Sequence, residues 1–463
     1  MSRTSGRLLT TLLALATALG CGRAPEPTPV VWIVVDTLRA DHLDWYGYER
    51  PTSAGLKRLR SDSILFECAY TPHPETTPAI ASLLTGLDPP RHGVRGLYQK
   101  LHGDNRSLAE VLADAGYETA AFVSSFVMIR DFCGLDQGFA TYDDFVTERE
   151  RNRDNFERRA AATLALARDF LERRDAGRPL FLFLHLIDPH GPYDPPEPWA
   201  SRFRTGEEIP IRGTVPLYQR VPGVDRLGPY LDRYDGEIAY VSRELGGFLD
   251  HLAETGLYDR ALIVFTADHG ESFGERGVTM KHGDDVFQEN VHVPLLVKLP
   301  GARPAGAPRV TAAAVSLTDL APTTLDMIGL PVLSGLDGVS FRSLLDGRPF
   351  ERVPVPMWSK PGSEERGFAL AAGREKWMIA GSAAPIVRFD LAADPGETAP
   401  RAGDEGTPPG MAELSRQWLE HRTPFTVEGN FMETALRGDF VRSRMSAADR
   451  ANLERLKSLG YIH

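Results

Sequence analysis

The stretch Val30–Asp36, VVWIVVD, decides the fold. Six apolar residues stand in a row, and a carboxylate follows them. Because the run is continuous rather than alternating, it indicates a strand that is covered on both faces. Such a strand belongs to a sheet with helices on each side, and the carboxylate then lies at its carboxyl end.

Four further apolar runs repeat this pattern, at Thr119–Val123, Leu180–Leu186, Ala261–Thr266 and Val293–Val297. Helical patterns lie between the runs, at Ser107–Ala115, Phe156–Glu172 and Asp235–Leu252. Strands that alternate with helices predict an α/β fold with a central, mostly parallel sheet flanked by helices. Residues 200–230 are rich in proline, glycine and arginine and predict a loop insertion. A smaller C-terminal subdomain is expected after about residue 346.

Carboxylates and imidazoles follow or precede these runs. They are Asp36 after the first run, Asp188 and His190 after the third, Asp268 and His269 after the fourth, and His282 before the last. Because parallel strands end at one edge of a sheet, we expect these side chains to meet. Carboxylate together with imidazole suits Zn²⁺ or Mn²⁺ better than Ca²⁺. Taken singly, each residue has a plainer interpretation, as a helix cap or a hydrogen-bonded polar residue.

A candidate nucleophile lies in the segment Glu75–Gly86, ETTPAIASLLTG. Thr77 fits an N-cap and Pro78 the first helical position, so Thr76 is expected just before a helix N-terminus. Free amides and the helix dipole there stabilise an anion such as a phosphoryl or sulfuryl group. A threonine hydroxyl becomes a nucleophile when a metal or a base activates it. The alternative is that Thr76 and Thr77 only cap the helix.

Composition narrows the classes of function. The chain has 463 residues, with 52 Lys and Arg against 63 Asp and Glu, and a net charge of −11. That charge argues against a nucleic-acid-binding surface, and the length allows a large core. Three cysteines do not make a disulfide framework. Cys68 and Cys133 either pair with each other or lie in the core as thiols.

The N-terminus has the pattern of a bacterial lipoprotein signal. Arg3 and Arg7 precede the apolar run Leu8–Leu19, which is too short to span a bilayer, and Gly20 precedes Cys21. We expect cleavage before Cys21, acylation of that cysteine, and attachment to the periplasmic side of a membrane, with the outer membrane favoured. A cleaved signal with an incidental cysteine is the alternative. The predicted organisation is a signal and lipidation site at 1–21, a Pro-rich tether at 22–29, a catalytic domain at 30–345 and the C-terminal subdomain at 346–463.

At this point the pattern resembles the sulfatase family, within the alkaline phosphatase superfamily. The matching segments are Val34–His42 with Tyr46–Tyr48, Thr76–Gly86, Asp188–Tyr193, Asp268–Glu271, Val293–Leu295, Asp319–Leu325 and Leu459–Tyr461. They follow one another in the family order along most of the chain. The resemblance implies a sandwich in which helices cover a central sheet, and an ester hydrolase that binds a divalent metal.

Four departures from the family pattern bear on the chemistry. Sulfatases convert a motif Cys or Ser to formylglycine, and Thr76 stands at that position. The motif arginine is Ile80, which we interpret as a residue at the pocket rim that would accept a less charged diester. A substrate-binding lysine is replaced by Ser124, and the usual Asp-Asp pair is Asp36-Thr37. The formylglycine route is therefore closed to this chain.

The site also resembles superfamily members in which a metal-bound threonine attacks phosphate esters. These include nucleotide pyrophosphatase/phosphodiesterases and phosphoethanolamine transferases. The resemblance implies that Asp36, Thr76, Asp268 and His269 hold a metal. It implies that His190 and His282 assist the leaving oxygen, or bind a second metal or the charged oxygens of the substrate.

Several functions remain open at this stage. A phosphoesterase that uses Thr76 and forms a covalent intermediate is favoured. A sulfuric ester hydrolase that works without formylglycine, a phosphoethanolamine-type transferase and an inactive anion-binding lipoprotein are the alternatives. Each takes an anionic ester or a related anion as its partner, whether glycan, lipid or small molecule. The oligomeric state stays open.

Overall fold

The computed structural model describes residues 26–416, with gaps at 147, 150–155, 278, 352–353, 361–366, 380–384, 404–406, 409, 412 and 415. The predicted signal, Cys21 and the Leu459–Tyr461 motif lie outside the described residues. Within the described part, none of the helices combines the length and apolar character needed to cross a bilayer.

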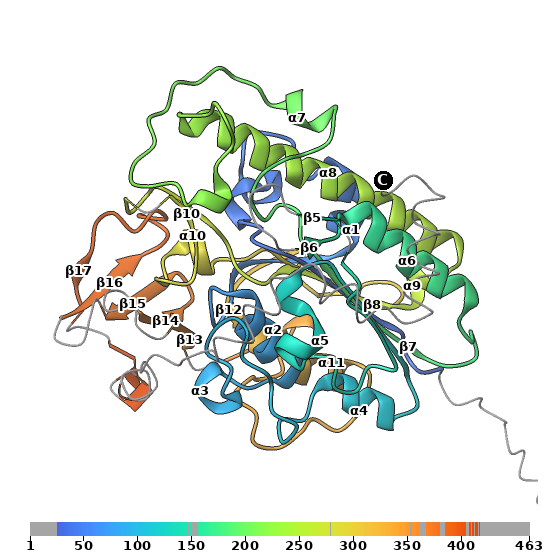
Figure 1. The fold of residues 1–463 in the computed structure, drawn as a ribbon. Helices are drawn as coiled ribbons and strands as arrows, with labels where there is room; N and C mark the ends of the chain where they lie inside the picture. The colour runs from blue at the N-terminus through green and yellow to red at the C-terminus, as the bar shows by residue number, and fades with distance from the viewer. Residues whose placement is uncertain are drawn as a thin grey trace, which may run out of the picture.

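An eight-stranded sheet forms the centre of the molecule (Figure 1), in the order β12-β2-β11-β8-β1-β7-β3-β4. All neighbouring pairs are parallel except the two that involve β11, so the predicted mostly parallel sheet is confirmed. Its strands are β1 Val30–Val35, β2 Ile64–Tyr70, β3 Glu118–Val123, β4 Thr141–Asp143, β7 Leu180–Leu186, β8 Leu262–Ala267, β11 Leu295–Lys298 and β12 Val310–Ser316.

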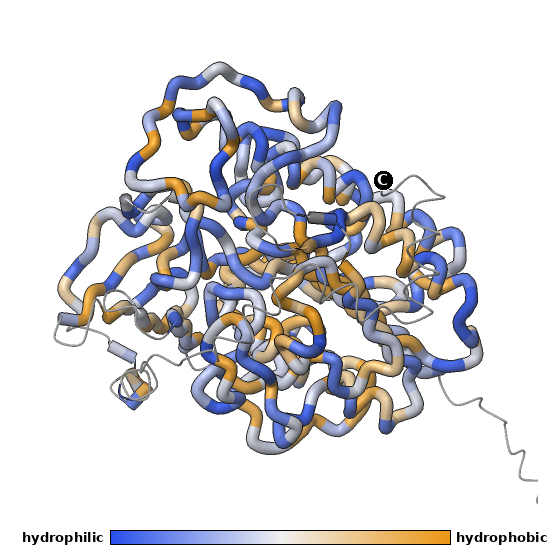
Figure 2. Tube along the Cα trace, viewed as in Figure 1, coloured by the Kyte–Doolittle hydropathy of each residue, from blue (hydrophilic) through white to orange (hydrophobic). Residues whose placement is uncertain are grey.

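Helices cover both faces of this sheet. In Figure 1, α6, α8 and α9 lie over one face, and α2, α4 and α11 lie over the other. Every residue of β1 and β7 is consequently buried, as their continuous apolar sequence predicts. Figure 2 shows the same distribution, with hydrophobic residues gathered along the central strands. The helices are α2 Thr76–Thr85, α4 Leu108–Asp114, α6 Ala160–Arg173, α8 Leu227–Glu254, α9 Leu257–Arg260 and α11 Leu320–Met327.

Two predicted helices begin elsewhere. The helix expected from Phe156 begins at Ala160, because Phe156 and Glu157 form the short strand β6, which pairs with β5 at Glu148–Arg149. The helix expected from Asp235 begins at Leu227, so the loop insertion predicted at 200–230 is shorter at its C-terminal end. Cys68 and Cys133 are both buried and free, which confirms the core-thiol interpretation.

The C-terminal subdomain is a five-stranded antiparallel sheet at the left of Figure 1. Its strands are β13 Val355–Trp358, β14 Phe368–Ala372, β15 Glu375–Ile379, β16 Ile386–Asp390 and β17 Arg401–Ala402. The amide of Lys360, just after β13, donates to the carbonyl of Gly283 at 3.0 Å. The subdomain therefore contacts the loop that carries His282.

Candidate active site

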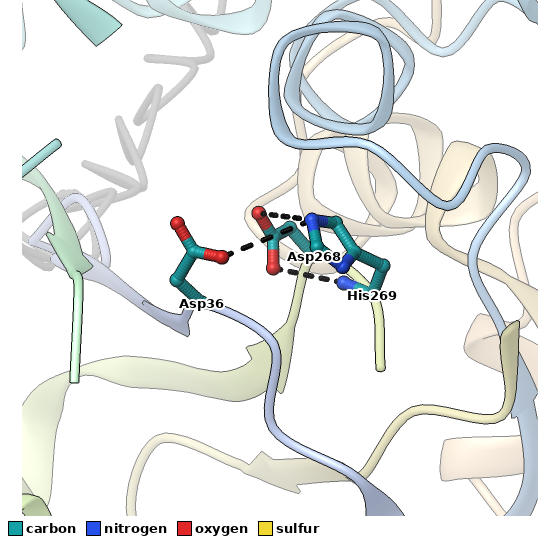
Figure 3. A group of neighbouring side chains, drawn as sticks. All are labelled: Asp36, Asp268 and His269. Carbon is teal, nitrogen blue, oxygen red and sulfur yellow. Dashed lines mark hydrogen bonds and ion pairs between the residues drawn. The ribbon is translucent and has the colours of Figure 1, made fainter. Parts of the chain in front are cut away.

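The central strands β1 and β8 bring two aspartates together. The strands pair in parallel, with Val35 opposite Ala267, so Asp36 and Asp268 leave the sheet side by side. Both are fully buried (Figure 3). Thr37, at the position of the second family aspartate, has φ +52° and donates its amide to Asp268 Oδ1 at 3.2 Å. This left-handed residue turns the chain away from the line of β1 directly after Asp36.

His269 completes the group. Its Nε2 lies 3.8 Å from Asp36 Oδ1 and 3.6 Å from Asp268 Oδ2. Its Nδ1 donates to the carbonyl of Gly270 at 2.9 Å, which leaves the lone pair of Nε2 directed at the carboxylates. One ligand atom from each of Asp36, Asp268 and His269 lies within 4.8 Å of the others.

This group fits a divalent metal. In the part of the chain that the structure describes, Asp36 Oδ1 and Oδ2 and Asp268 Oδ2 are buried without a hydrogen-bond partner. Burial, together with repulsion by Asp268 and Glu271, raises the pKa of Asp36 well above its usual range. Burial also lowers the pKa of His269 to about 4, with Asp268 opposing that shift and His282 adding to it. A neutral imidazole between two unpaired carboxylates is a donor set for Zn²⁺ or Mn²⁺.

His185, which the sequence analysis missed, lies against the same carboxylates. It belongs to the interior of β7 and is fully buried. Its Nε2 lies 3.6 Å from Asp36 Oδ2 and 3.8 Å from Asp268 Oδ2. Because the residue sits within the apolar run LFLFLHL, the pattern of that run concealed it. The adjacent pairing of β7 with β1, which places His185 opposite Val34, is what brings it to the site.

Thr76 lies at the N-terminus of α2. The helix begins at Thr76 itself, with Glu75 as its N-cap, two residues earlier than predicted. Thr76 Oγ1 lies 3.3 Å from His269 Nε2, so the hydroxyl faces the carboxylate–imidazole group. The expected placement of Thr76 beside free helix amides and beside Asp36, Asp268 and His269 agrees with this geometry.

His282 is held by a second residue that the sequence analysis left unassigned, Glu271. The Nδ1 of His282 lies 3.3 Å from Glu271 Oε1, and the other carboxylate oxygen accepts from the Tyr193 hydroxyl at 3.4 Å and the Gln219 amide at 3.3 Å. Burial lowers the pKa of His282, but Glu271 outweighs it and the pKa is raised. Glu271 therefore favours the protonated imidazole and fixes its direction.

His190 lies beside His282, with ring centroids 5.7 Å apart, and the rings of His282 and His269 are 4.3 Å apart. Its Nδ1 donates to the carbonyl of Gly191 at 2.7 Å. Asp188, the carboxylate that follows the same apolar run as His190, accepts from the amide of Ala160 at 2.8 Å. That carboxylate caps the start of α6, and the carboxylate placed beside His282 is Glu271.

These residues open into a cavity of about 230 Å³, lined by Asp36, Thr76, His190 and His282. Two cations, Lys281 and Lys360, line it together with Glu75, whose pKa burial raises to about 7. Both lysines contact Asp284, Lys360 at 2.5 Å. A larger cavity of about 600 Å³ has a different lining, which includes Trp45, Tyr46 and Arg374.

The family carries an arginine at the position of Ile80 and a lysine at the position of Ser124. Neither residue is part of the lining of this cavity as described. Ile80 is fully buried in the main hydrophobic core, which corrects its expected place at the pocket rim. Ser124 is also fully buried, and its hydroxyl lies 2.8 Å from that of Thr163. Positive charge reaches the cavity from Lys281 and Lys360 instead. Lys360 belongs to the C-terminal subdomain, so no local sequence motif connects it with the site.

Comparisons with known proteins agree with the fold. The sulfatase family model matches residues 28–330. An arylsulfatase of Clostridium perfringens is 24% identical over 428 residues, which cover 80% of this chain and 89% of that protein. Human N-sulphoglucosamine sulphohydrolase is 30% identical over 297 residues, 60% of this chain and 56% of that protein.

Solved structures share the architecture. The phosphonate monoester hydrolase of Agrobacterium radiobacter superposes with a TM-score of 0.66 at 21% identity, and the match covers 85% of this chain and 95% of that one. This likeness concerns the fold. The family model, in contrast, covers well over half of the chain, including Asp36, Thr76, Asp268 and His269. The chain therefore belongs to the sulfatase family of ester hydrolases.

Proposed function

We propose that this protein is a metal-dependent hydrolase of phosphate or sulfate monoesters or diesters in which Thr76 is the nucleophile. The observation that carries the proposal is the Thr76 hydroxyl, 3.3 Å from His269 Nε2 at the start of α2 and inside the cavity that Asp36 lines. Asp36, Asp268, His269 and Thr76 would hold the metal. A bound metal would favour the alkoxide form of a coordinated hydroxyl and offset charge on the ester oxygens.

The side chains of the cavity account for the reaction in two displacements. Thr76 Oγ1 forms a bond to phosphorus or sulfur, and the bond from that atom to the alcohol oxygen breaks. His282 in its protonated form, or His190, gives a proton to the departing oxygen. Water then attacks the same phosphorus or sulfur, the bond from that atom to Thr76 Oγ1 breaks, and the same histidine takes up a proton from that water, which restores the Thr76 alkoxide. Lys281 and Lys360 line the cavity and attract the anionic group.

Phosphate is the favoured centre because Thr76 replaces the residue that becomes formylglycine in sulfatases. The named relatives include an N-acetylglucosamine-6-O-sulfatase and the solved neighbours include a phosphonate monoester hydrolase. Both names describe enzymes whose substrates carry an anionic sulfate or phosphonate group. Sulfate-ester hydrolysis by Thr76 is the second candidate, since the family model and the curated relatives are sulfatases.

Turnover of three aryl esters tests the proposal. The full chain, loaded with Zn²⁺ or Mn²⁺, is given an aryl phosphodiester, an aryl phosphomonoester and an aryl sulfate, and nitrophenol release is followed. Thr76→Ala is expected to reduce turnover by at least about 10³-fold, because the nucleophile is lost.

The matched control is Thr77→Ala, the same change at the next residue, which lies outside the lining of the cavity as described. It is expected to retain most of the activity. Full turnover by Thr76→Ala would disprove the nucleophile assignment. Turnover restricted to the sulfate, and lost in Thr76→Ala, would transfer the proposal to sulfate esters.

A further inference from the structure

The catalytic cavity has two chemically different sides. One carries the charged and imidazole groups described above. The other is formed by five side chains that we call the apolar wall: Leu97, Tyr98, Phe126, Val127 and Phe156. Ser125 and Glu157 are the polar residues that lie between them in the lining.

Three members of the apolar wall, Tyr98, Phe126 and Phe156, pack on one small core cluster. The rings of Tyr98 and Phe126 have centroids 6.4 Å apart, and both rings pack against Phe132. Phe126 and Phe132 belong to a small core cluster against which Tyr98 and Phe156 pack. A backbone bridge between Ser125 and Glu157 holds Phe156 beside Phe126. These side chains are therefore supported from behind, and they do not depend on a ligand for their positions.

Tyr98, one of the residues of the apolar wall, has an unfavourable backbone conformation. Its φ is +63°, in the left-handed region that a bulky side chain rarely adopts. Residues held in such conformations concentrate at ligand-binding sites, where the surrounding structure compensates the strain. The conformation directs an aromatic ring to the cavity at a position where asparagine or glycine would be easier to accommodate.

The reaction geometry decides what the wall contacts. In a displacement by Thr76, the leaving oxygen points away from the attacking oxygen and toward His190 or His282, so the alcohol portion attached to it lies against the remaining lining of the cavity. A hydroxylated alcohol placed against Leu97, Phe126, Val127 and Phe156 would lose hydrogen bonds to water that these four side chains do not replace. An apolar alcohol would gain from the same contact. The cavity of about 230 Å³ limits the size of the group that fits.

We infer that the apolar wall binds the alcohol portion of the ester and selects a compact apolar alcohol, an aromatic ring or a short branched chain, over a sugar. The inference rests on the proposed function, because reaction at Thr76 is what fixes the direction of the leaving group. It names the substrate class that this site takes, and it assigns specificity to residues that lie outside the metal-binding group.

Affinity for two phosphonates tests the wall without requiring turnover. The probes are phenylphosphonate and 2,3-dihydroxypropylphosphonate, which carry the same charged group on an apolar and a hydroxylated substituent. Their dissociation constants are measured by calorimetry on the full chain loaded with Zn²⁺. We expect phenylphosphonate to bind about tenfold tighter or more, since its ring is buried against the wall.

Two variants connect the preference to the wall. Val127→Thr replaces one methyl group with a hydroxyl of the same shape, and Tyr98→Asn removes the ring with a residue that tolerates positive φ. Each is expected to reduce the preference for phenylphosphonate at least about threefold. Val111→Thr is the matched control, because this partly buried valine packs on the main core and lies outside the lining of the cavity as described.

The outcomes separate the two proposals. Equal affinities for the probes, no binding of phenylphosphonate at millimolar concentration, or a preference that survives both wall variants would overturn the apolar wall as a specificity site. The turnover of Thr76→Ala is measured on the same preparations. If that variant keeps full activity while the phosphonate preference is present, the nucleophile assignment fails and the apolar binding site stands.

Discussion

His185 lies directly against both carboxylates of the candidate metal site, which indicates that it positions them. Its imidazole lies between Asp36 and Asp268 without a hydrogen-bond partner among the described residues. Groups that orient metal ligands typically change metal affinity by about 10–100-fold when they are removed. We expect His185→Leu to lower the affinity for Zn²⁺ by this factor, measured as metal retained during dialysis against graded chelator concentrations.

His185→Gln is the matched variant, because it keeps an N–H donor in the same place. It is expected to restore part of the metal affinity, whereas a role limited to packing would make leucine the better replacement. Unfolding of both metal-free variants shows whether the fold is intact. Unchanged metal retention in His185→Leu would contradict a positioning role.

Glu271 is expected to set the upper pH limit of activity through His282. The carboxylate raises the pKa of the imidazole, so His282 stays protonated to a higher pH and can donate to the leaving oxygen there. Activity that needs this proton is present below the pKa of His282 and is lost as pH rises through it. In Glu271→Gln that loss should occur at a lower pH, seen as a shifted alkaline limb in kcat/KM. An unshifted limb would assign the proton to His190.

At the scale of elements, the sequence predicts the strands that are apolar throughout and misses those that are not. All five predicted runs are strands within two residues of the predicted bounds. The strand β2 was missed because Glu67 interrupts it, and β12 because its alanines and exposed positions carry little hydrophobic signal. The antiparallel direction of β11 is likewise invisible in its sequence, since direction depends on which strands it joins.

The same distinction holds for the site. The aspartates and histidines that follow strands were predicted, because the end of a buried strand marks a position at the sheet edge. His185 was missed because it lies inside a strand, and Lys360 because it comes from another sheet. The positions of His185 and Lys360 depend on which strands and sheets lie side by side in the folded protein, and a sequence pattern does not show this.

The turn after β8 depends on one glycine. A Cβ at Gly270 would lie 2.0 Å from the carbonyl oxygen of Glu289, at the start of the short helix α10, Gln288–Val291. The amide of Gly270 also donates to the carbonyl of Asn290 at 2.9 Å. We expect Gly270→Ala to cost about 1–3 kcal/mol or more of unfolding free energy and to displace His269.

Gly103→Ala is the control for that substitution, because a Cβ there meets nothing within 4 Å. Denaturant unfolding and metal retention are measured on both variants. If Gly270→Ala were as stable and as metal-competent as Gly103→Ala, the close approach of α10 would not be what positions His269.

At the scale of the molecule, a buried ion pair fastens the C-terminal sheet to the catalytic domain. Lys376 on β15 and Glu397 are both fully buried, 2.8 Å apart. Lys376 also donates to the carbonyl of Val286, and Glu397 accepts from the amide of Gln288 at 2.8 Å. Both partners belong to the C-terminal subdomain, and through these two hydrogen bonds they contact Val286 and Gln288 of the catalytic domain, just after the loop that carries His282.

Removing one partner of this pair should lower the free energy of unfolding more than removing both. Lys376→Met leaves Glu397 buried without its cation, at a cost of about 3–5 kcal/mol of unfolding free energy. The double variant Lys376→Met/Glu397→Gln should recover a large part of that loss, measured by denaturant midpoints. Equal stability of the single and double variants would show that the pair contributes little coupling.

The order of the strands also governs how fast this protein can fold. The first strand, β1, is completed only when it pairs with β7 and β8, about 150 and 230 residues later in the chain. During synthesis the apolar strand β1 therefore stays without its partner strands until most of the catalytic domain has been made. Chains with such distant partners fold slowly and leave apolar surface exposed until the partners are present. We therefore expect Asp36 and Asp268 to come together only after β8 has formed, and we expect chaperones that cover the early strands to raise the yield of active protein.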